Sequence, residues 1–450
     1  MTVAERRGAG KAARAAAPRG SHAQWKPTPG RADPVSILRA QDATRLPKYV
    51  PIRYGRMSVS PFAFYRGAAA VMAADLAATP VCGLRTQLCG DAHLSNFGTY
   101  ASPERTLLFG ITDFDETLPG PFEWDLKRLA ASVVVAGRDQ GFTRAQCREA
   151  ALTALRIYRE RISEYAEMRD LDVWYAHVSA DDALAAARAA GGVRIRRTEL
   201  AVAKARTRDN LQALERFTTV VDGRRRIVDS PPLIVHLTAA DAAVEQVVHD
   251  AYTAYMRTLE DDRRVLADRY TFVDMARKVV GVGSVGTRCM IGLFQGRDDQ
   301  DPLFLQVKEA GPSVLEVYAG RSHYRNHAHR VVAGQRLMQA TSDIFLGWIE
   351  DAEGRCFYWR QLRDMKGSVE VVDVLPSGLV ALAGVCGWAL ARAHARAGDR
   401  LAIAAYLGRS DRFDRAVADF ALAYGDQNER DYRRLLEAIK AGEVKAETGV

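Results

Sequence analysis

The stretch "QLCGDAHLSNFG" at residues 87–98 places polar side chains directly behind an apolar run that is typical of a strand. Slightly further on, "LLFGITDFDET" at 107–117 repeats the pattern, because its apolar run also ends in carboxylates. The polar residues are Asp91, His93 and Asn96 in the first stretch, and Asp113 and Asp115 in the second. One Asp or Asn behind one strand is usually a turn residue. Two strand ends that deliver such groups to one place predict a functional site.

The composition is ordinary for a soluble globular protein, with 48% hydrophobic and 26% charged residues. A chain of 450 residues is long enough for a bilobal unit with a sizeable core. Of the formal charge of +8, residues 1–33 carry +5, because seven Lys and Arg stand there against two acidic residues. The basic balance is mostly a property of this segment, so it argues only weakly for nucleic acid, and nucleic-acid binding is not expected.

The first 35 residues are rich in Ala, Gly, Pro and Arg, and they are predicted to form a disordered basic tail. Such a composition buries too little apolar surface to offset the entropy of ordering. The segment has no apolar stretch typical of a secretory signal, and the six cysteines form no C-x-x-C pair or dense framework. The most apolar run, at 379–391, is too short to span a bilayer. We therefore expect a cytoplasmic protein with no membrane contact.

Helical periodicity dominates residues 36–270, the part that contains both motif stretches. Between 271 and 368 the pattern changes to five strand-like runs, separated by Gly-rich and Asp-rich turns, with one helical segment at 323–341. Residues 369–450 are helical again. These patterns predict an α+β protein of two lobes, in which a small β-rich lobe is inserted between helical parts of a larger one.

The third motif is "GVGSVG" at 281–286. A dinucleotide site of the G-x-G-x-x-G type needs a helix directly after the glycines, but another strand-like run follows here. A third run, "PLFLQVKEA" at 302–310, contains Lys308. Kinases use this arrangement, in which the loop covers the phosphates of the nucleotide and the Lys reaches them. We therefore assign nucleotide binding to Gly281, Gly283, Ser284, Gly286 and Lys308.

The acid that pairs with Lys308 is less clearly marked. Glu316 follows closely and is ranked first, so it joins the nucleotide-binding set. Glu309 would point to the opposite face of the strand, since neighbouring side chains alternate. Gln335 lies on a strong helical pattern and could take the place of an acid.

Two segments resemble known enzymes. "GDAHLSN" resembles the G-D-x-H-x-x-N signature of aminoglycoside and choline phosphotransferases and their kinase-like relatives. "ITDFDET" resembles the segment with which those enzymes bind Mg²⁺, and "WDLKRLAAS" at 124–132 is similar to the run that follows it. In those enzymes the Asp of that run, here Asp125, braces the catalytic loop.

The resemblance also implies roles for the motif residues. Asp91 would orient and deprotonate the hydroxyl of the acceptor, with His93 in a secondary role that orients the loop. Asn96 and Asp113 would hold Mg²⁺, with Asp115 as a further acid of that metal site. The implied cofactors are therefore ATP and Mg²⁺.

The order of the motifs differs from that of ordinary kinases. There the glycine-rich loop and its Lys precede the catalytic loop, whereas here Gly281 follows Asp91 by 190 residues. Both sets belong to one site only if the chain is circularly permuted, which a fold tolerates when its termini lie at the surface. We therefore predict a permuted, protein-kinase-like bilobal fold in which Lys308 and Asp113 face each other across one cleft.

A decoy occurs at "HARAGD", residues 394–399, which imitates the start of a catalytic loop. The residue five places after Asp399 is Ala404 rather than Asn, and no apolar strand that ends in a carboxylate follows. We reject this stretch as the active site and interpret His394 as a residue of helix-end packing.

From about residue 50 to 435 the chain resembles a bacterial family known as domain of unknown function 2252. The resemblance rests on segments such as "RMSVSPFAFYRGAA", "KVVGVGSVGTR", "LFLQVKEA" and "YGDQNERDY". That family is grouped with the kinase-like superfamily, and the resemblance implies no particular substrate.

We therefore expect an ATP- and Mg²⁺-dependent phosphotransferase that acts on a small-molecule hydroxyl. Three alternatives stay open: AMP transfer to a protein, a non-catalytic nucleotide-binding regulatory module, and metal-dependent hydrolysis at the motif carboxylates and His93. Hydrolysis leaves the glycine-rich loop and Lys308 unexplained. The sequence names neither the acceptor nor an oligomeric state. Arg53, Arg56 and Arg66 could hold an anionic substrate, although a solvated or salt-bridged role is commoner for such residues.

Overall fold

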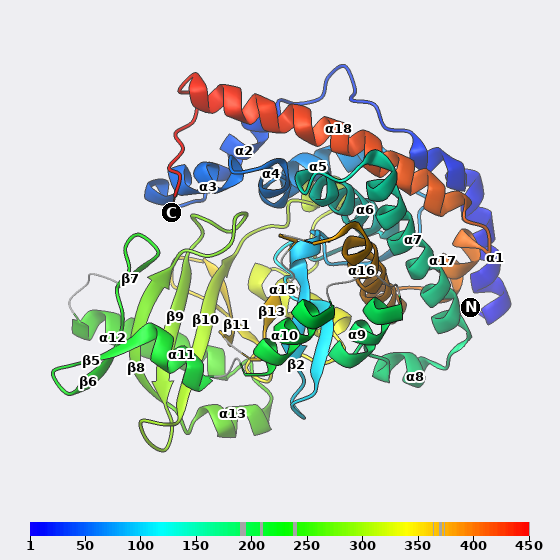
Figure 1. The fold of residues 1–450 in the computed structure, drawn as a ribbon. Coiled ribbons are helices and arrows are strands. Elements are labelled where there is room, and N and C mark those ends of the chain that lie inside the picture. Colours follow the sequence, from blue (N-terminus) through cyan, green and yellow to red (C-terminus); the bar gives the residue numbers. More distant parts are fainter. Residues whose placement is uncertain are drawn as a thin grey trace.

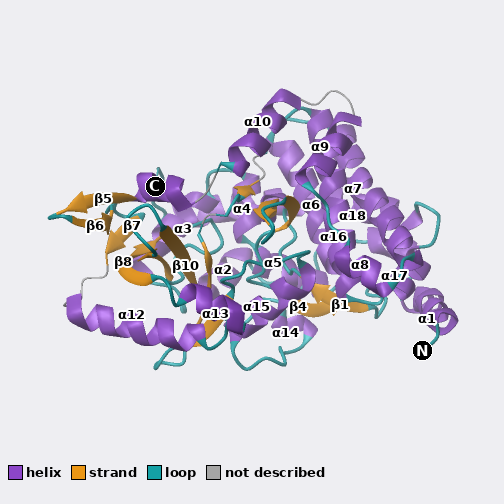
Figure 2. Ribbon diagram, turned by 90° about the horizontal axis from the view of Figure 1, so that it is seen from below, coloured by secondary structure: helices purple, strands orange, loops and turns teal. Residues whose placement is uncertain are grey.

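The computed structural model describes residues 1–189, 195–207, 210–236, 241–362, 364–368, 371–372 and 374–449. The chain forms a mixed α+β structure, as expected, with a helical region on one side and a β-rich region on the other (Figure 1). Seen from below, most of the helices gather in one half of the molecule, and most of the strands lie in the other half together with α12 and α13 (Figure 2).

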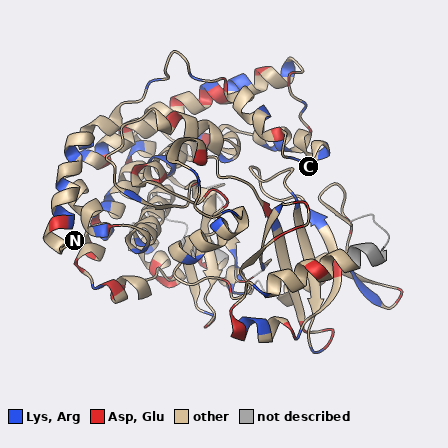
Figure 3. Cartoon of the chain, turned by 180° about the vertical axis from the view of Figure 1, so that it is seen from behind, with Lys and Arg blue, Asp and Glu red and all other residues tan. Residues whose placement is uncertain are grey.

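The helical region is built around α6 (Phe122–Asp139), α7 (Arg144–Glu167), α16 (Pro376–Ala397) and α18 (Arg412–Lys440). α16 lies along α7, and α18 crosses α6 and α7 (Figure 1). α6 is buried along nearly its whole length, and its buried residues include four charged ones in its first two turns: Glu123, Asp125, Lys127 and Arg128. Basic and acidic residues are interspersed along α18, so the positive charge of the chain does not gather there (Figure 3).

The apolar run that the sequence marks as too short for a bilayer lies within α16, which is longer than that run. By length and composition alone, α16 is sufficiently apolar to cross a membrane, but 78% of its apolar window is buried inside the protein. Its apolar surface therefore belongs to the core that it forms with α7.

The N-terminal segment is folded, so the prediction of a disordered tail is wrong. α1 (Val3–Ala16) begins with a capping box between Thr2 and Glu5, and it packs against α17 (Arg400–Leu407). The 3₁₀ helix η1 (Arg19–Ala23) places His22 in the core, with its Nε2 2.6 Å from the hydroxyl of Tyr406. As its composition suggests, the segment forms no core of its own. It becomes ordered because its small residues pack against helices from the far end of the chain.

Five short helical elements follow: α2 (Pro34–Asp42), η2 (Pro47–Tyr49), α3 (Val50–Met57), α4 (Pro61–Gly67) and α5 (Ala69–Ala77). The helix expected at 60–80 is therefore divided in two. Its start is as predicted, because the Ser60 hydroxyl accepts a hydrogen bond from Ala63 N and Pro61 occupies the first turn. The division allows Gly67 to pack closely against Met57 of α3.

The strands expected before the two motifs are present. β1 (Arg85–Leu88) pairs antiparallel with β4 (Leu118–Pro121), and β2 (Phe97–Ala101) pairs antiparallel with β3 (Leu107–Ile111). β13 (Gly367–Ser368) adds to the edge of β2. The 3₁₀ turn η3 (Leu94–Asn96) joins the first motif to β2, and the second motif follows β3 directly. Both motifs therefore leave short, buried strands of the helical region.

The β-rich region is a six-stranded antiparallel sheet in the order β11-β12-β10-β9-β8-β7. Its strands are β7 (Ile234–His236), β8 (Thr271–Lys278), β9 (Cys289–Gln295), β10 (Pro302–Ala310), β11 (Gly347–Glu350) and β12 (Cys356–Gln361). Five of them match the five predicted runs. Side chains alternate between two cores, since Leu303 and Leu305 face one and Phe304 faces the other.

Helices cover both faces of this sheet. α12 (Asp241–Met256) and α13 (Asp261–Ala267) pack on one face, and α11 (Asn210–Phe217) with the hairpin of β5 (Thr218–Val221) and β6 (Arg224–Ile227) packs on the other. The hairpin turn at Asp222-Gly223 is present as predicted, with both residues at positive φ. α11, the β5–β6 hairpin, α12 and α13 therefore share their cores with the sheet, so the β-rich region begins well before residue 271.

The remaining helices connect these regions. α8 (Asp170–Tyr175), α9 (Ala180–Ala189) and α10 (Ile195–Arg206) follow α7, and α14 (Glu316–Ala319) and α15 (His327–Met338) follow β10. α15 contacts both β12 and α16, so it lies at the junction of the helical and β-rich regions.

Candidate functional site

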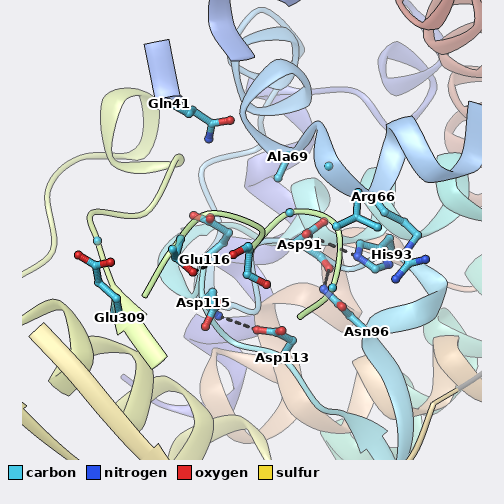
Figure 4. Close-up of a pocket in the computed structure, with 18 of the residues that line it drawn as sticks. Gln41, Arg66, Ala69, Asp91, His93, Asn96, Asp113, Asp115, Glu116 and Glu309 are labelled. Atoms are coloured by element: carbon cyan, nitrogen blue, oxygen red, sulfur yellow. Dashed lines mark hydrogen bonds and ion pairs between the residues drawn. The ribbon is translucent and has the colours of Figure 1, made fainter. Parts of the chain in front are cut away.

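A cleft between the helical region and the sheet collects most of the residues that the sequence singled out (Figure 4). The predicted residues that line it are Asp91, His93, Asn96, Asp113, Asp115, Gly281, Gly283 and Ser284. They come from the two motif stretches and from the loop between β8 and β9, which are far apart in the sequence. The prediction that these stretches meet at one place is therefore confirmed.

The loop that carries Asp91 is fixed from behind by Asp125 of α6. One oxygen of this carboxylate accepts a hydrogen bond from Cys89 N at 2.8 Å, and the other accepts one from Gly90 N at 3.1 Å. The Nε2 of His394 lies 3.2 Å from Asp125, and Nδ1 of His394 lies 2.9 Å from the Tyr158 hydroxyl. Asp125 thus braces the loop, as the resemblance implied, and His394 holds the brace in addition to packing in the core.

Asp91 is held by a cation that the sequence analysis did not single out. Arg128 of α6 places its Nε 2.8 Å and its Nη2 2.7 Å from Oδ1 of Asp91. The guanidinium is buried and lies over the ring of Tyr65, 3.9 Å from the ring centre. Oδ2 of Asp91 remains on the side of His93, 3.7 Å from its Nε2. Arg128 therefore fixes one oxygen of Asp91 and leaves the other at the cleft.

His93 is a buried, neutral group in this site. Burial lowers its pKa to about 4, so the imidazole carries no charge near neutral pH. Its Nδ1 is buried and has no hydrogen-bond partner among the described residues. A neutral imidazole against Asp91 is compatible with the orienting role expected for it, and that role stays a prediction.

Asn96 and Asp113 bring oxygen atoms to the cleft from neighbouring strand ends. Asn96 donates from Nδ2 to the backbone oxygen of Asp91 at 2.9 Å, which leaves its Oδ1 available as an acceptor. Burial alone would raise the pKa of Asp113, but Lys308 and Arg360 outweigh it and lower that pKa to about 2. Asp113 is therefore a carboxylate at any ordinary pH.

The described residues contain no cluster of three or more His, Cys, Asp or Glu that is arranged to hold a metal ion. An oxygen pair such as Asn96 and Asp113 still fits Mg²⁺, because that ion usually takes one or two protein oxygens and completes its shell with water and phosphate oxygens. The donor set therefore suits a metal that arrives with a phosphorylated substrate better than a metal caged by protein alone.

Lys308 of β10 reaches the second motif from the sheet. Its Nζ lies 2.6 Å from Oδ2 of Asp115 and 3.5 Å from Oδ2 of Asp113. Burial opposes the charge of Lys308, but the two carboxylates outweigh burial and raise its pKa well above the usual value. The Tyr358 hydroxyl donates to the other oxygen of Asp115 at 2.6 Å. The expected approach of Lys308 to Asp113 is thus confirmed, and Asp115 is an ion-pair partner of the Lys.

Glu316 does not take the place that the sequence analysis gave it. Among the described residues, the carboxylates paired with Lys308 are Asp113 and Asp115. Glu316 begins α14, accepts a hydrogen bond from Ser313 N at 3.3 Å and lies 3.9 Å from Nε of Arg330. The chain turns directly after β10, so Glu316 faces α15. The acids that pair with Lys308 belong to the helical region instead.

The two other candidates for this pairing have different partners as well. Glu309 pairs with Arg288 at 3.1 Å and also lines the cleft (Figure 4). Gln335 is buried in α15 and donates to Gln339 at 3.0 Å.

The glycine-rich loop is fastened to the N-terminal helices. Gly281 and Gly286 have φ of 66° and 92°, values that favour glycine, so both are needed for the turn itself. The carbonyl of Gly281 accepts a hydrogen bond from Arg56 at 2.6 Å, and that of Gly286 accepts one from Leu46 N at 2.8 Å. Between them, the carbonyl of Val285 accepts a hydrogen bond from Arg45.

Two valines anchor the same loop by apolar contact. Val282 packs into the core that α2, α3 and α4 form with α18, and Val285 packs against Tyr49 and Ile52. This anchoring was not predicted from the sequence. The two valines within "GVGSVG" were its signal, since fully solvated glycine-rich turns have no need of apolar residues.

The cleft also contains residues that the sequence analysis missed or set aside. Gln41, Arg45 and Glu116 line it; Gln41 and Arg45 belong to no recognised motif, and Glu116 lies within the second motif but was given no role. Arg66, one of three arginines considered for an anionic substrate, lies next to Asp91 and His93 in the cleft (Figure 4). The other two are engaged elsewhere, because Arg53 pairs with Asp42 at 2.9 Å and Arg56 holds the glycine-rich loop.

The chain belongs to the family described as an uncharacterized protein conserved in bacteria, domain of unknown function 2252, whose family model matches residues 45–438. This range contains every site residue predicted from the sequence. No curated protein and no solved structure gives a match.

Proposed function

We propose that this chain is an ATP- and Mg²⁺-dependent phosphotransferase with a circularly permuted, kinase-like bilobal fold, and that it acts on a small-molecule hydroxyl. The observation that carries the proposal is the ion pair of Lys308 with Asp113 and Asp115 at the cleft that the glycine-rich loop also lines. Three kinase-like elements that lie far apart in the sequence thus contribute to one site.

The nucleotide would bind between the loop from Gly281 to Gly286 and the carboxylates of the second motif. Gly283 and Ser284 line the cleft, and the missing side chain at Gly283 lets a phosphate come close to the backbone. Lys308 is a buried cation held at the same place, and it would pair with phosphate oxygens as well as with Asp115. The N-terminal helices hold the loop in position before the nucleotide arrives.

Asn96 and Asp113 would hold Mg²⁺, because they present oxygen ligands in the number that this ion takes from proteins. When bound, Mg²⁺ would neutralise negative charge on the phosphates of the nucleotide.

Asp91 would act on the acceptor. Its fixed Oδ1 is bound to Arg128, and its Oδ2 would accept the proton of the acceptor hydroxyl. The acceptor oxygen then forms a bond to the γ-phosphorus, the bond from that phosphorus to the bridging oxygen breaks, and ADP leaves. The protein contributes mainly orientation and charge, since no covalent intermediate is required.

The arrangement also bears on the alternatives. Metal-dependent hydrolysis would need several protein ligands around one ion, and the motif carboxylates with His93 form no such cluster in the described part of the chain. AMP transfer would use the same nucleotide-binding residues, so the distinction between AMP transfer and phosphoryl transfer lies in the products.

The test is a mass analysis of products after incubation with Mg–ATP and pooled hydroxyl-bearing metabolites. ADP with a phosphorylated metabolite is the expected result, and Asp91→Asn should abolish it. Asp399→Asn is the matched control, because Asp399 caps α17 and pairs with Arg6 away from the cleft. AMP attached to protein would replace this proposal with nucleotidyl transfer. Free phosphate alone would replace it with hydrolysis, and ATP left unchanged would refute catalysis.

A further inference from the structure

Arg66 of α4 is a cation of the cleft that has no partner in the described structure. Its side chain lines the cleft beside Asp91 and His93 (Figure 4). Its Nε is buried, yet it makes no hydrogen bond to any described residue. An unpaired buried donor is costly, and such groups are usually satisfied in native proteins. A site that leaves an arginine in this state predicts a ligand that completes it.

Asp91 does not form an ion pair with Arg66 in the described structure. The Oδ1 of Asp91 is bound by both Nε and Nη2 of Arg128, which is the ion-pair partner of this carboxylate. Burial lowers the pKa of Arg66, and the nearby charge of Asp91 opposes this shift only in part. The guanidinium of Arg66 is therefore partly removed from water, and the charge of Asp91 does not fully offset the cost of that desolvation.

We propose that the acceptor carries an anionic group, a phosphate or a carboxylate, which binds Arg66 while its hydroxyl meets Asp91. This inference rests on the proposed phosphotransferase function and names the class of its second substrate. An arginine suits the task, since its guanidinium can give two parallel hydrogen bonds to either kind of anion.

The position of Arg66 assigns it to the acceptor rather than to the nucleotide. The groups placed for phosphates are Lys308 and the glycine-rich loop. The backbone oxygen of Arg66 neighbours Gly283 of that loop, but its side chain lies beside the proposed base (Figure 4). An anion at Arg66 would hold the acceptor at a second point next to its reacting hydroxyl. Two-point binding of this kind is how an enzyme orients a small substrate.

The experiment measures the binding of two probes, inorganic phosphate and acetate, by calorimetric titration. It uses the full chain saturated with Mg²⁺ and a non-hydrolysable ATP analogue, so that the phosphate positions of the nucleotide are already filled. The variants are Arg66→Gln, Arg66→Lys and the control Arg39→Gln, which changes an exposed arginine of α2. The separate phosphate and acetate arms tell which anion the site prefers.

We expect saturable binding of at least one probe to the wild type and to Arg39→Gln. Arg66→Gln should weaken it at least about tenfold, the scale of one lost charge-assisted contact, and Arg66→Lys should keep part of it. The inference is overturned if neither probe binds the wild type, if Arg66→Gln binds both as the wild type does, or if Arg66→Gln weakens the ATP analogue instead. An analogue that fails to bind the wild type would refute the proposed function, and the probes would then be titrated without it.

Discussion

The two walls of the cleft are held by different kinds of contact. Buried charges hold the wall that carries Asp91, because Asp125 binds the loop backbone and Arg128 binds the carboxylate itself. The wall formed by the glycine-rich loop is held by hydrogen bonds to its carbonyls from Arg45, Leu46 and Arg56. The supports of the first wall come from α6, next to the motif in sequence, whereas those of the second come from more than two hundred residues away.

This difference suggests that one wall takes part in the reaction and that the other wall only positions the backbone of the loop. Under the proposed function, the charges of the first wall would act on the reacting groups, so changes there should have large effects on turnover or on folding. The contacts of the second wall only position a backbone turn, through the apolar packing of Val282 and Val285 and through hydrogen bonds of modest net value. Asp91→Asn and Arg56→Gln below test this division, whereas Lys308→Met and His22→Gln test contacts that join distant segments; the four are given from the largest expected effect to the smallest.

Asp91→Asn should lower turnover by about 10²–10⁴-fold, the usual contribution of a general base. The binding of Mg–ATP should change by less than about twofold, because in the proposed mechanism Asp91 would face the acceptor, and the amide can still accept a hydrogen bond from Arg128. Steady-state kinetics and calorimetry measure the two quantities. Normal turnover in this variant would show that Asp91 is not the base.

Lys308→Met should lower the free energy of unfolding by about 3–5 kcal/mol, because it leaves two carboxylates without their buried cation. Lys308→Arg keeps the charge and should retain much of that stability. Denaturant unfolding measures both. A loss below about 1 kcal/mol in the Met variant would mean that the ion pair does not hold the two regions together.

The docked N-terminal segment should be sensitive to acid. Burial lowers the pKa of His22 to about 3 from an ordinary value of 6.5, so below pH 6.5 the unfolded chain binds a proton that the folded chain excludes. The contribution of His22 to the unfolding free energy is fully present above pH 6.5 and is lost as pH falls toward 3.

Relative to His22→Gln, the wild type should lose about 2–3 kcal/mol of unfolding free energy between pH 7 and pH 4.5. Denaturant titrations at several pH values give this difference. If the unfolding free energies of the two proteins changed in parallel with pH, His22 would be exposed to solvent and the N-terminal segment would not be docked.

Arg56→Gln should have the smallest effect. It removes one hydrogen bond to the carbonyl of Gly281, so about 1 kcal/mol of stability and less than about tenfold in nucleotide affinity should be lost. Arg39→Gln serves as the control on the neighbouring helix α2. If Arg56→Gln abolished nucleotide binding, the loop would depend on one contact and the division between the walls would fail.

The sequence predicted the first wall far better than the second. The motif around Asp91 and the brace Asp125 lie within one stretch, where short apolar runs and polar ends are local signals. The approach of Lys308 to Asp113 was also predictable, because the motif types required it.

What the sequence could not predict depends on contacts between distant segments. The order of residues 1–33 arises from α17 and α18, and no local pattern encodes a docking surface provided from beyond residue 400. The pairing of Lys308 with Asp115 instead of Glu316 depends on the turn that follows β10. Arg66 was one of three arginines considered for an anion, and only its position in the cleft distinguishes it from the other two.

The central claim is that both walls hold one Mg–ATP molecule, and calorimetric titration of Mg–ATP tests it most directly. Asp113→Asn changes the carboxylate wall, and Gly283→Val changes the loop at a position where an added Cβ meets nothing closer than 3.4 Å. We expect one Mg–ATP site per chain in the wild type and at least about a tenfold loss of Mg–ATP affinity in each variant. The effect of Asp113→Asn should vanish when Mg²⁺ is omitted. Wild-type affinity in either variant would contradict the central claim, because that wall would then take no part in holding the nucleotide.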